Sequence, residues 1–429
     1  MKTKLLISTI IALVLVSCHQ TYEHKTVICI PVYGQSLALG EEAERMTDFD
    51  SLANYADGRI VTENQDHQFG YFDNNDLKEL TKKLVRYQKR AFELSIYNMA
   101  KVLADATGSD TLICIFPGGQ GATAIANLSK GTIPYQKFIE KIANAHQEAI
   151  SRGWDFRIPA ICWMQGESDI VDYPQTDYQQ MLTKIREDMN NDICQLTGHQ
   201  DTIPFICYQA NSLTRAEKFN ANQYECRETY VPQSFVNLLS SDEHFWASGP
   251  TYPYDCVGEK IHIDAIGQQS IGALAAKTAL GILRDKKRFR GLIPLNATCQ
   301  DTTVTIHFNV PYPPLAIDTI QVHKAENYGF SVINHQNQNI ANSIIVEGDS
   351  VIIHCTESPK NCRIKYAVNG EYMKSGRLHG PRGNLRDSQG DSYSISIQDK
   401  HYPIHNWCYQ FDILCKQNSF NADTSPKNE

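Results

Sequence analysis

The stretch Val27-Ile28-Cys29-Ile30-Pro31-Val32-Tyr33-Gly34-Gln35-Ser36 decides the fold. Its continuous apolar run over residues 27–32 is typical of a strand that is buried on both faces. The run ends in a glycine-containing turn that carries Ser36. A serine at the carboxyl end of a strand can be directed into a cleft, where N–H groups of the next segment lie close to it. The stretch therefore predicts a strand of a parallel sheet with a candidate nucleophile at its end.

The segment that follows repeats this pattern up to about residue 287. Because strand-like runs alternate with helical periodicity, we expect an α/β fold in three layers, with a parallel sheet covered by helices on both faces. In such a sheet, ligands bind beyond the carboxyl ends of the strands. The predicted strands are 27–32, 111–116, 156–163, 202–208 and 235–239, and the predicted helices lie near 78–106, 134–152, 173–196 and 267–284.

The pattern of apolar residues changes after residue 287, where helical periodicity disappears. Short alternating runs, separated by Pro, Asn, Gly and Asp, predict a β-sandwich-like accessory domain over residues 288–415. The polar segment 416–429 is predicted to be disordered. The predicted strands of this domain are 303–308, 319–323, 330–333, 350–354 and 363–367.

The N-terminus has the composition of an export signal over residues 1–17, with Lys2 and Lys4 before the apolar run 5–16. A helix of that length rises about 18 Å, too short for a hydrocarbon core of about 30 Å. The ending Leu15-Val16-Ser17-Cys18 resembles the lipobox of bacterial lipoproteins. That resemblance implies a lipid on Cys18, a tether over residues 18–26 and a place in the bacterial cell envelope, either periplasmic or at the outer membrane. A plain secretory peptide with an incidental cysteine is the alternative.

The charge composition argues against two classes of partner, nucleic acids and anionic membrane surfaces. The 429 residues carry 40 Lys and Arg against 48 Asp and Glu, a formal charge of −8, and show no long basic run. Nucleic acid is therefore a poor candidate partner, and so is an anionic membrane surface. The 10% aromatic content suits a carbohydrate ligand as well as ordinary packing.

The chain has 13 cysteines, and export would permit disulfides. The likelier bridging residues are Cys355 and Cys362, which flank a turn, and Cys408 and Cys415, which flank an apolar run; the pairing stays open. There is no CxxC or HExxH motif. We therefore expect no metal cofactor.

Three further polar segments accompany Ser36. Pro117 to Thr123 contains three glycines, which allow the backbone to approach a ligand closely. Trp163 to Asp169 reads WMQGESD, and Glu259-Lys260-Ile261-His262 precedes the last predicted helix of the α/β part. Taken singly, Ser36 is an ordinary turn serine, Pro117 to Thr123 is a flexible loop, and His262 is a structural histidine. Together they place serine, amide, carboxylate and imidazole groups at one edge of the sheet.

The four segments resemble the SGNH (GDSL-like) hydrolase superfamily, within it the sialate O-acetylesterase-like carbohydrate esterases. Gly34-Gln35-Ser36 is similar to the nucleophile block of this branch, and WMQGESD is similar to its WxQGExD block. The resemblance implies that Ser36 is the nucleophile, that His262 is its base and that Glu259 is the triad acid. Because the family has Asp where this chain has Glu259, Asp255 and Asp264 remain alternative acids.

The resemblance also implies an oxyanion hole made of the N–H groups of Ser36 and Gly121 and the side-chain amide of Gln165, with Ala122 as the alternative to Gly121. The implied reaction is acyl transfer through a serine ester, which removes an acetyl group from a carbohydrate without any cofactor. Two alternatives remain. One is a glycan-binding lipoprotein whose SGNH domain has lost activity, and the other is an SGNH esterase that acts on peptidoglycan acetyl or longer acyl esters.

Overall fold

The computed structural model describes residues 24–62, 64–66, 71–74, 92–171, 177–210, 230–285, 287–371 and 374–417. The predicted signal peptide, Cys18 and the tail beyond residue 417 lie outside the described residues. Among the described residues, no helix is both long enough and apolar enough to cross a membrane.

The α/β part is built on a parallel sheet whose strands are interrupted midway. Backbone hydrogen bonds from Ile30 N–H to Cys114 O and from Cys162 N–H to Pro31 O join the halves across the interruptions. Counting each interrupted strand once, the order is β3, β6/β7, β1/β2, β8/β9, β10, β11, which is the flavodoxin-like order with β3 added at one edge. The strands are β1 (Thr26–Cys29), β2 (Val32–Gly34), β3 (Ile60–Val61), β6 (Thr111–Cys114), β7 (Pro117–Gly119), β8 (Asp155–Arg157), β9 (Ile161–Met164), β10 (Phe205–Gln209) and β11 (Phe245–Pro250).

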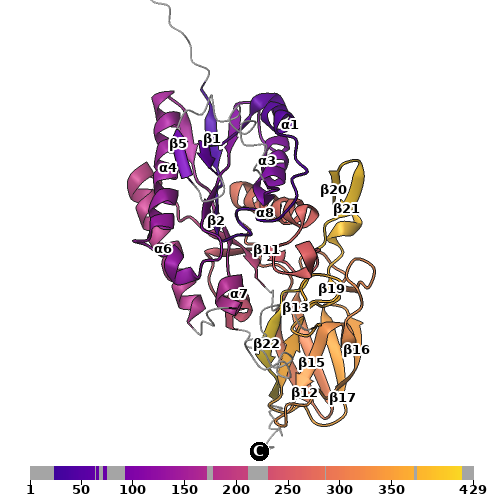
Figure 1. Ribbon diagram of the computed structural model, residues 1–429. Coiled ribbons are helices and arrows are strands. Elements are labelled where there is room, and N and C mark those ends of the chain that lie inside the picture. The colour runs from indigo at the N-terminus through magenta and orange to yellow at the C-terminus, as the bar shows by residue number, and fades with distance from the viewer. Residues whose placement is uncertain are drawn as a thin grey trace, which may run out of the picture.

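Helices cover both faces of this sheet, so the predicted three-layer α/β fold is confirmed. Helices α3 and α8 pack together on one side, while α4, α6 and α7 lie on the other (Figure 1). The helices are α1 (Phe49–Asn54), α3 (Ser95–Asp105), α4 (Ile133–Ser151), α5 (Glu167–Val171), α6 (Tyr178–Thr197), α7 (Tyr230–Ser241) and α8 (Ala265–Arg284). A small hairpin pairs β4 (Asn64–Asp66) with β5 (Tyr71–Asn74).

One predicted strand is wrong. Residues 235–239 belong to α7, where the buried side chains of Val231, Phe235, Leu238 and Leu239 follow the helical spacing of one face. The short apolar run 235–239 fits either element when it is taken alone. The fifth strand is β11, further along the chain. Of the predicted helix 78–106, residues 95–105 are helical, and residues 75–91 lie outside the described residues.

The accessory part consists of mainly antiparallel sheets, as predicted, and lies below the α/β part in Figure 1. A five-stranded sheet has the order β16-β17-β13-β12-β23, and a three-stranded sheet has the order β15-β18-β22. Their strands are β12 (Ile293–Gln300), β13 (Thr303–Asn309), β15 (Phe330–Ile333), β16 (Ala341–Glu347), β17 (Ser350–Cys355), β18 (Arg363–Tyr366), β22 (Phe411–Leu414) and β23 (Lys416–Gln417). The smaller pairs are β14 (Ala316–Ile317) with β19 (Leu385–Arg386) and β20 (Ser394–Ile397) with β21 (Lys400–Pro403).

Two expectations for this part need correction. Residues 319–323 form turns rather than a strand, because the Asp318 carboxylate accepts hydrogen bonds from the backbone N–H groups of Ile320 and Gln321. Residues 416 and 417 are not disordered. They form β23, which pairs in parallel with β12.

A continuous buried interface joins the two parts. The Gln209 side-chain amide bonds the backbone of Gln410 in both directions, with its Nε2 2.8 Å from the carbonyl oxygen and its Oε1 2.7 Å from the N–H. Tyr252 donates to Cys408 O at 2.8 Å, and the Tyr409 hydroxyl accepts from Gly249 N–H at 2.8 Å. One hydrophobic core consequently extends from the parallel sheet into the antiparallel sheets.

The predicted disulfide candidates are all free thiols. Cys355, Cys362, Cys408 and Cys415 are buried, and none is bonded to another cysteine. The thiol of Cys408 lies 3.5 Å from Tyr409 O, and Cys415 lies near Cys299. Burial raises the pKa of both thiols, so they stay protonated.

Candidate active site

Ser36 and His262 meet at the carboxyl end of β2, as the sequence predicts. The Nε2 atom of His262 lies 2.8 Å from Oγ of Ser36, although 226 residues separate them in the chain. Ser36 lies two residues after the end of β2, in a turn where the backbone N–H groups of Leu39 and Glu41 donate to the Ser36 carbonyl. The contact has the geometry of a serine whose proton a neighbouring imidazole can remove.

The carboxylate in contact with His262 belongs to Glu42. Its Oε2 lies 2.6 Å from Nδ1 of His262, the ring nitrogen that faces away from Ser36. Glu42 has a backbone φ of 64°, in the left-handed region that non-glycine residues rarely occupy. Such strained backbone is frequent at functional sites, where the surrounding structure holds it in place. The three side chains thus form a line of contacts, Ser36–His262–Glu42, in which Ser36 and Glu42 come from one loop.

The structure does not bring Glu259, the predicted triad acid, into contact with His262. Its carboxylate points into the accessory part, where Oε2 lies 2.7 Å from Nζ of Lys374 and 3.1 Å from Nδ1 of His379. These two partners hold the pKa of Glu259 below its usual value. The backbone of Glu259 also has a positive φ, of 56°. Its side chain therefore does not have the orientation toward His262 that the sequence spacing predicts.

The two alternative acids also have other partners. Asp255 pairs with Arg377 at 2.9 Å. Asp264 is the N-cap of α8, where its Oδ1 accepts from Gly267 N–H at 2.8 Å. Neither carboxylate contacts His262.

Two backbone N–H groups remain available for an oxyanion. Those of Ser36 and Gly121 have no hydrogen-bond partner among the described residues. Gly121 lies beside the nucleophile, since a Cβ built on it would stand 3.9 Å from the Cβ of Ser36. The alternative residue, Ala122, has a φ of 50°.

Gln165 does not fit the predicted oxyanion role. Its side chain is fully buried, and its Nε2 already donates to Thr123 O at 3.1 Å and to Asp169 Oδ2 at 2.5 Å. Its Oε1 accepts from the Tyr178 hydroxyl at 2.8 Å. Because an amide NH2 group has two hydrogens, none is left for a substrate. Gln165 instead fixes the glycine-rich loop to the segment that follows β9.

The two carboxylates of the WMQGESD segment are structural. The Tyr208 hydroxyl donates to Glu167 at 2.6 Å, and the Ile125 N–H donates to Asp169 at 2.9 Å. Burial raises the pKa of Glu167 to about 7 and that of Asp169 to about 6. Ser168 N–H reaches Oε1 of Gln35 at 3.3 Å, which ties this segment to the nucleophile turn.

The accessory part supports the loop that carries His262. We call residues 374–379 the brace. Within the brace, Ser375 N–H donates to Glu259 O at 2.9 Å, and Arg377 N–H donates to Tyr254 O at 3.1 Å. Gly376 has a φ of 85°, and a Cβ built on it would stand 2.8 Å from Tyr254 O. The brace thus holds residues 254–259 by backbone hydrogen bonds and by close approach.

Sequence reasoning missed Glu42 and the brace. The available signal for Glu42 was its place only six residues after Ser36, in an acidic stretch that also contains Glu41 and Glu44. Among the described residues, no group of three or more His, Cys, Asp or Glu side chains could hold a metal ion.

Comparison with known proteins gives one family match and several similar solved structures. The model of the family described as carbohydrate esterase, sialic acid-specific acetylesterase, matches residues 71–280, which include Gln165 and His262 and begin after Ser36. The chain is similar to XAC1771, a carbohydrate acetylesterase from Xanthomonas citri, with 14% identity over 90% of this chain and 80% of that one and a TM-score of 0.58. A search of curated proteins gave no match.

Two smaller solved structures resemble the chain over a shorter range. NanS shares 14% identity over 61% of this chain and 99% of its own, with a TM-score of 0.44. Est24, a carbohydrate acetylesterase from Sinorhizobium meliloti, shares 13% identity over 60% of this chain and 99% of its own, with a TM-score of 0.32.

The chain is a carboxylic ester hydrolase with an SGNH-type α/β domain. More particularly, it resembles the sialate O-acetylesterase-like carbohydrate esterases, as its sequence blocks predict.

Proposed function

We propose that the chain removes O-acetyl groups from carbohydrate through an acetyl-serine intermediate, with Ser36 as nucleophile, His262 as base and Glu42 as the acid that orients it. The observation that carries this proposal is the pair of contacts at His262, 2.8 Å to Ser36 and 2.6 Å to Glu42. With Nδ1 donating to the Glu42 carboxylate, Nε2 is free to accept the proton of the Ser36 hydroxyl.

The reaction then proceeds in two halves. Ser36 Oγ bonds to the acetyl carbonyl carbon while its proton passes to His262, and the oxyanion accepts hydrogen bonds from the N–H groups of Ser36 and Gly121. The bond between the acetyl carbon and the sugar oxygen breaks, and His262 returns the proton to that oxygen. Water then attacks acetyl-Ser36 with His262 as base, which releases acetate and regenerates Ser36.

The place of this reaction is part of the proposal. The resemblance of residues 1–18 to a lipoprotein signal supports a lipid on Cys18 and a location in the bacterial cell envelope. Globomycin treatment of cells that express the full chain tests this, because a lipoprotein precursor accumulates with its signal attached, whereas a plain secreted form matures unchanged.

Hydrolysis of p-nitrophenyl acetate by wild type and Ser36→Ala tests the chemistry. We expect Ser36→Ala to lose at least about 10³-fold in kcat, while Ser392→Ala, at an exposed site in the accessory part, keeps wild-type turnover. Rapid quenching and mass spectrometry should find the acetyl group on the peptide that contains Ser36. Retained turnover in Ser36→Ala would contradict the proposal.

A further inference from the structure

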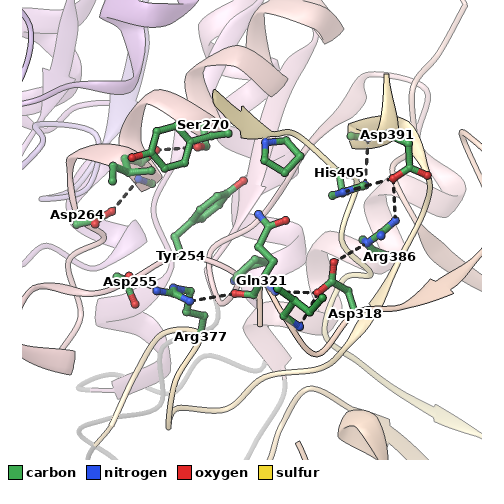
Figure 2. Close-up of a pocket in the computed structure, with 17 residues that line it drawn as sticks. Tyr254, Asp255, Asp264, Ser270, Asp318, Gln321, Arg377, Arg386, Asp391 and His405 are labelled. Carbon is green, nitrogen blue, oxygen red and sulfur yellow. Dashed lines mark hydrogen bonds and ion pairs between the residues drawn. The ribbon is translucent and has the colours of Figure 1, made fainter. Parts of the chain in front are cut away.

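A cavity lies between the α/β part and the accessory part, next to the loop that carries His262. Its volume is about 530 Å³, within the range of small-molecule sites. The loop supplies Tyr254, Asp255 and Asp264 to its wall, and Asp264 is two residues from His262. The accessory part supplies the opposite wall, which includes Gln321 and His405 (Figure 2).

Tyr254 presents an unused hydroxyl to this cavity. The side chain extends into the middle of the cavity in Figure 2, and the residue is only 7% exposed. Among the described residues, its hydroxyl has no hydrogen-bond partner. The hydroxyl is not among the buried side-chain atoms without a partner, so it is open to the solvent of the cavity and can bond to a ligand there.

Gln321 offers a second polar group without a partner. Its Oε1 is buried and accepts no hydrogen bond from any described residue, although its backbone is fixed by Asp318 and Arg377. Figure 2 shows the Gln321 side chain on the accessory side of the cavity, facing Tyr254. Tyr254 and Gln321 therefore bring one polar side chain from each part of the molecule to the cavity.

The charges of the cavity select against an anionic ligand. Both arginines of the wall are already paired, Arg377 with Asp255 at 2.9 Å and Arg386 with Asp318 at 2.8 Å. Asp264 and Asp391 add two further carboxylates. Burial lowers the pKa of His405, which keeps that ring neutral near pH 7. Carboxylate oxygens accept hydrogen bonds from hydroxyl groups and repel another carboxylate.

The cavity also has apolar surfaces of the kind that sugar rings contact. The rings of Tyr254 and Tyr402 both line it, and Ile320, which is 93% exposed, stands at its rim. A wall of apolar faces with a few convergent polar groups is the usual composition of a site for a small organic ligand.

We propose that this cavity is a subsite for a neutral sugar residue of the substrate, one that does not itself bear the reacting ester. The inference rests on the proposed esterase function and names its substrate class as a neutral acetylated oligosaccharide. It also gives the accessory part a role in recognition, because neither part forms the cavity alone.

The test compares acetylated xylo-oligosaccharides, which are neutral, with p-nitrophenyl acetate, which has no sugar. The measured quantity is the ratio of the two kcat/KM values. In Tyr254→Phe this ratio should fall about threefold to tenfold, the effect of one lost hydrogen bond. The matched variant Tyr312→Phe, at a site outside this cavity, should leave the ratio unchanged. Because the Tyr254 hydroxyl has no protein partner, Tyr254→Phe should fold normally.

Binding without turnover gives a second readout. Calorimetry with Ser36→Ala should detect xylohexaose, and adding Tyr254→Phe or Gln321→Ala should weaken its Kd by a similar factor. Unchanged ratios and unchanged Kd in both variants would overturn the subsite. So would a higher kcat/KM for 9-O-acetyl-N-acetylneuraminic acid, which is anionic, than for the neutral esters. Failure of the proposed esterase function would look different: wild type would not hydrolyse p-nitrophenyl acetate, whereas xylohexaose binding could still be measured.

Discussion

Glu42 and His262 are in contact through a 2.6 Å hydrogen bond although 220 residues separate them in the chain. Ser36 and Glu42 lie on the loop after β2, and His262 comes from the opposite end of the α/β part. The proposed triad therefore forms only when the loop before α8 is correctly placed. Each residue of this loop that contacts the accessory part bears on the position of the base.

Replacing Glu42 by alanine should lower kcat for p-nitrophenyl acetate by about 10²- to 10⁴-fold, because His262 loses the partner that sets its tautomer and stabilises its protonated form. Glu44→Ala, an exposed site two residues further on, should stay near wild type. Glu259→Ala should cost less than about tenfold, because Glu259 does not contact His262. A larger loss in Glu259→Ala than in Glu42→Ala would reverse the assignment.

Gln165→Ala should mainly lower the stability of the fold, with a smaller direct effect on kcat. It leaves the buried Asp169 carboxylate without its amide donor and opens a cavity, which together should lower the free energy of unfolding by about 2–4 kcal/mol. Chemical denaturation measures this directly. A true oxyanion donor would behave differently, losing about 10²–10³ in kcat with unchanged unfolding.

Gly376→Ala should displace the brace from the loop of His262, because the new Cβ would stand 2.8 Å from Tyr254 O. Gly348→Ala is the matched control, since Gly348 also has a positive φ, of 61°, but nothing lies within 4 Å of its Cβ position. Both variants should destabilise the fold by about 1 kcal/mol through backbone strain. Only Gly376→Ala should also lower kcat, by about tenfold or more. Equal kcat in the two variants would show that the brace does not position His262.

Because Glu167 is buried, its contribution to the free energy of unfolding should decrease as the pH rises, which is the opposite of the usual behaviour of a carboxylate. Its pKa rises from 4.5 to about 7 on folding, so the folded protein keeps a proton that the unfolded chain releases near pH 4.5. Its contribution to the free energy of unfolding is complete below pH 4.5 and is lost as the pH rises to about 7, with a slope of at most about 1.4 kcal/mol per pH unit. Glu167→Gln should flatten this slope in urea titrations from pH 4.5 to 7, and the exposed variant Glu140→Gln should not.

The sequence predicts those parts of the fold and site that depend on local pattern. Ser36 and His262 were predictable because each stands in a recognisable block at the sheet edge. Glu42 was not, because three glutamates follow Ser36 within eight residues, and only the left-handed backbone at position 42 selects one of them. Gln165 was misassigned for a related reason, since its free hydrogens depend on acceptors from segments far apart in the chain. The predicted strand 235–239 is wrong because an apolar run of five residues is too short to distinguish the periodicity of a strand from that of a helix.

The hydrogen bonds between the Gln209 side chain and the Gln410 backbone affect how the protein folds. The α/β part is complete in sequence at α8, yet the surface beyond β10 and β11 is closed by Tyr409 and Gln410, which follow more than a hundred residues later in the chain. Until these residues are in place, Tyr252 and the backbone at Gly249 lack the partners that bury them. We expect the α/β part to remain open on that side until the last strands of the chain have docked on it.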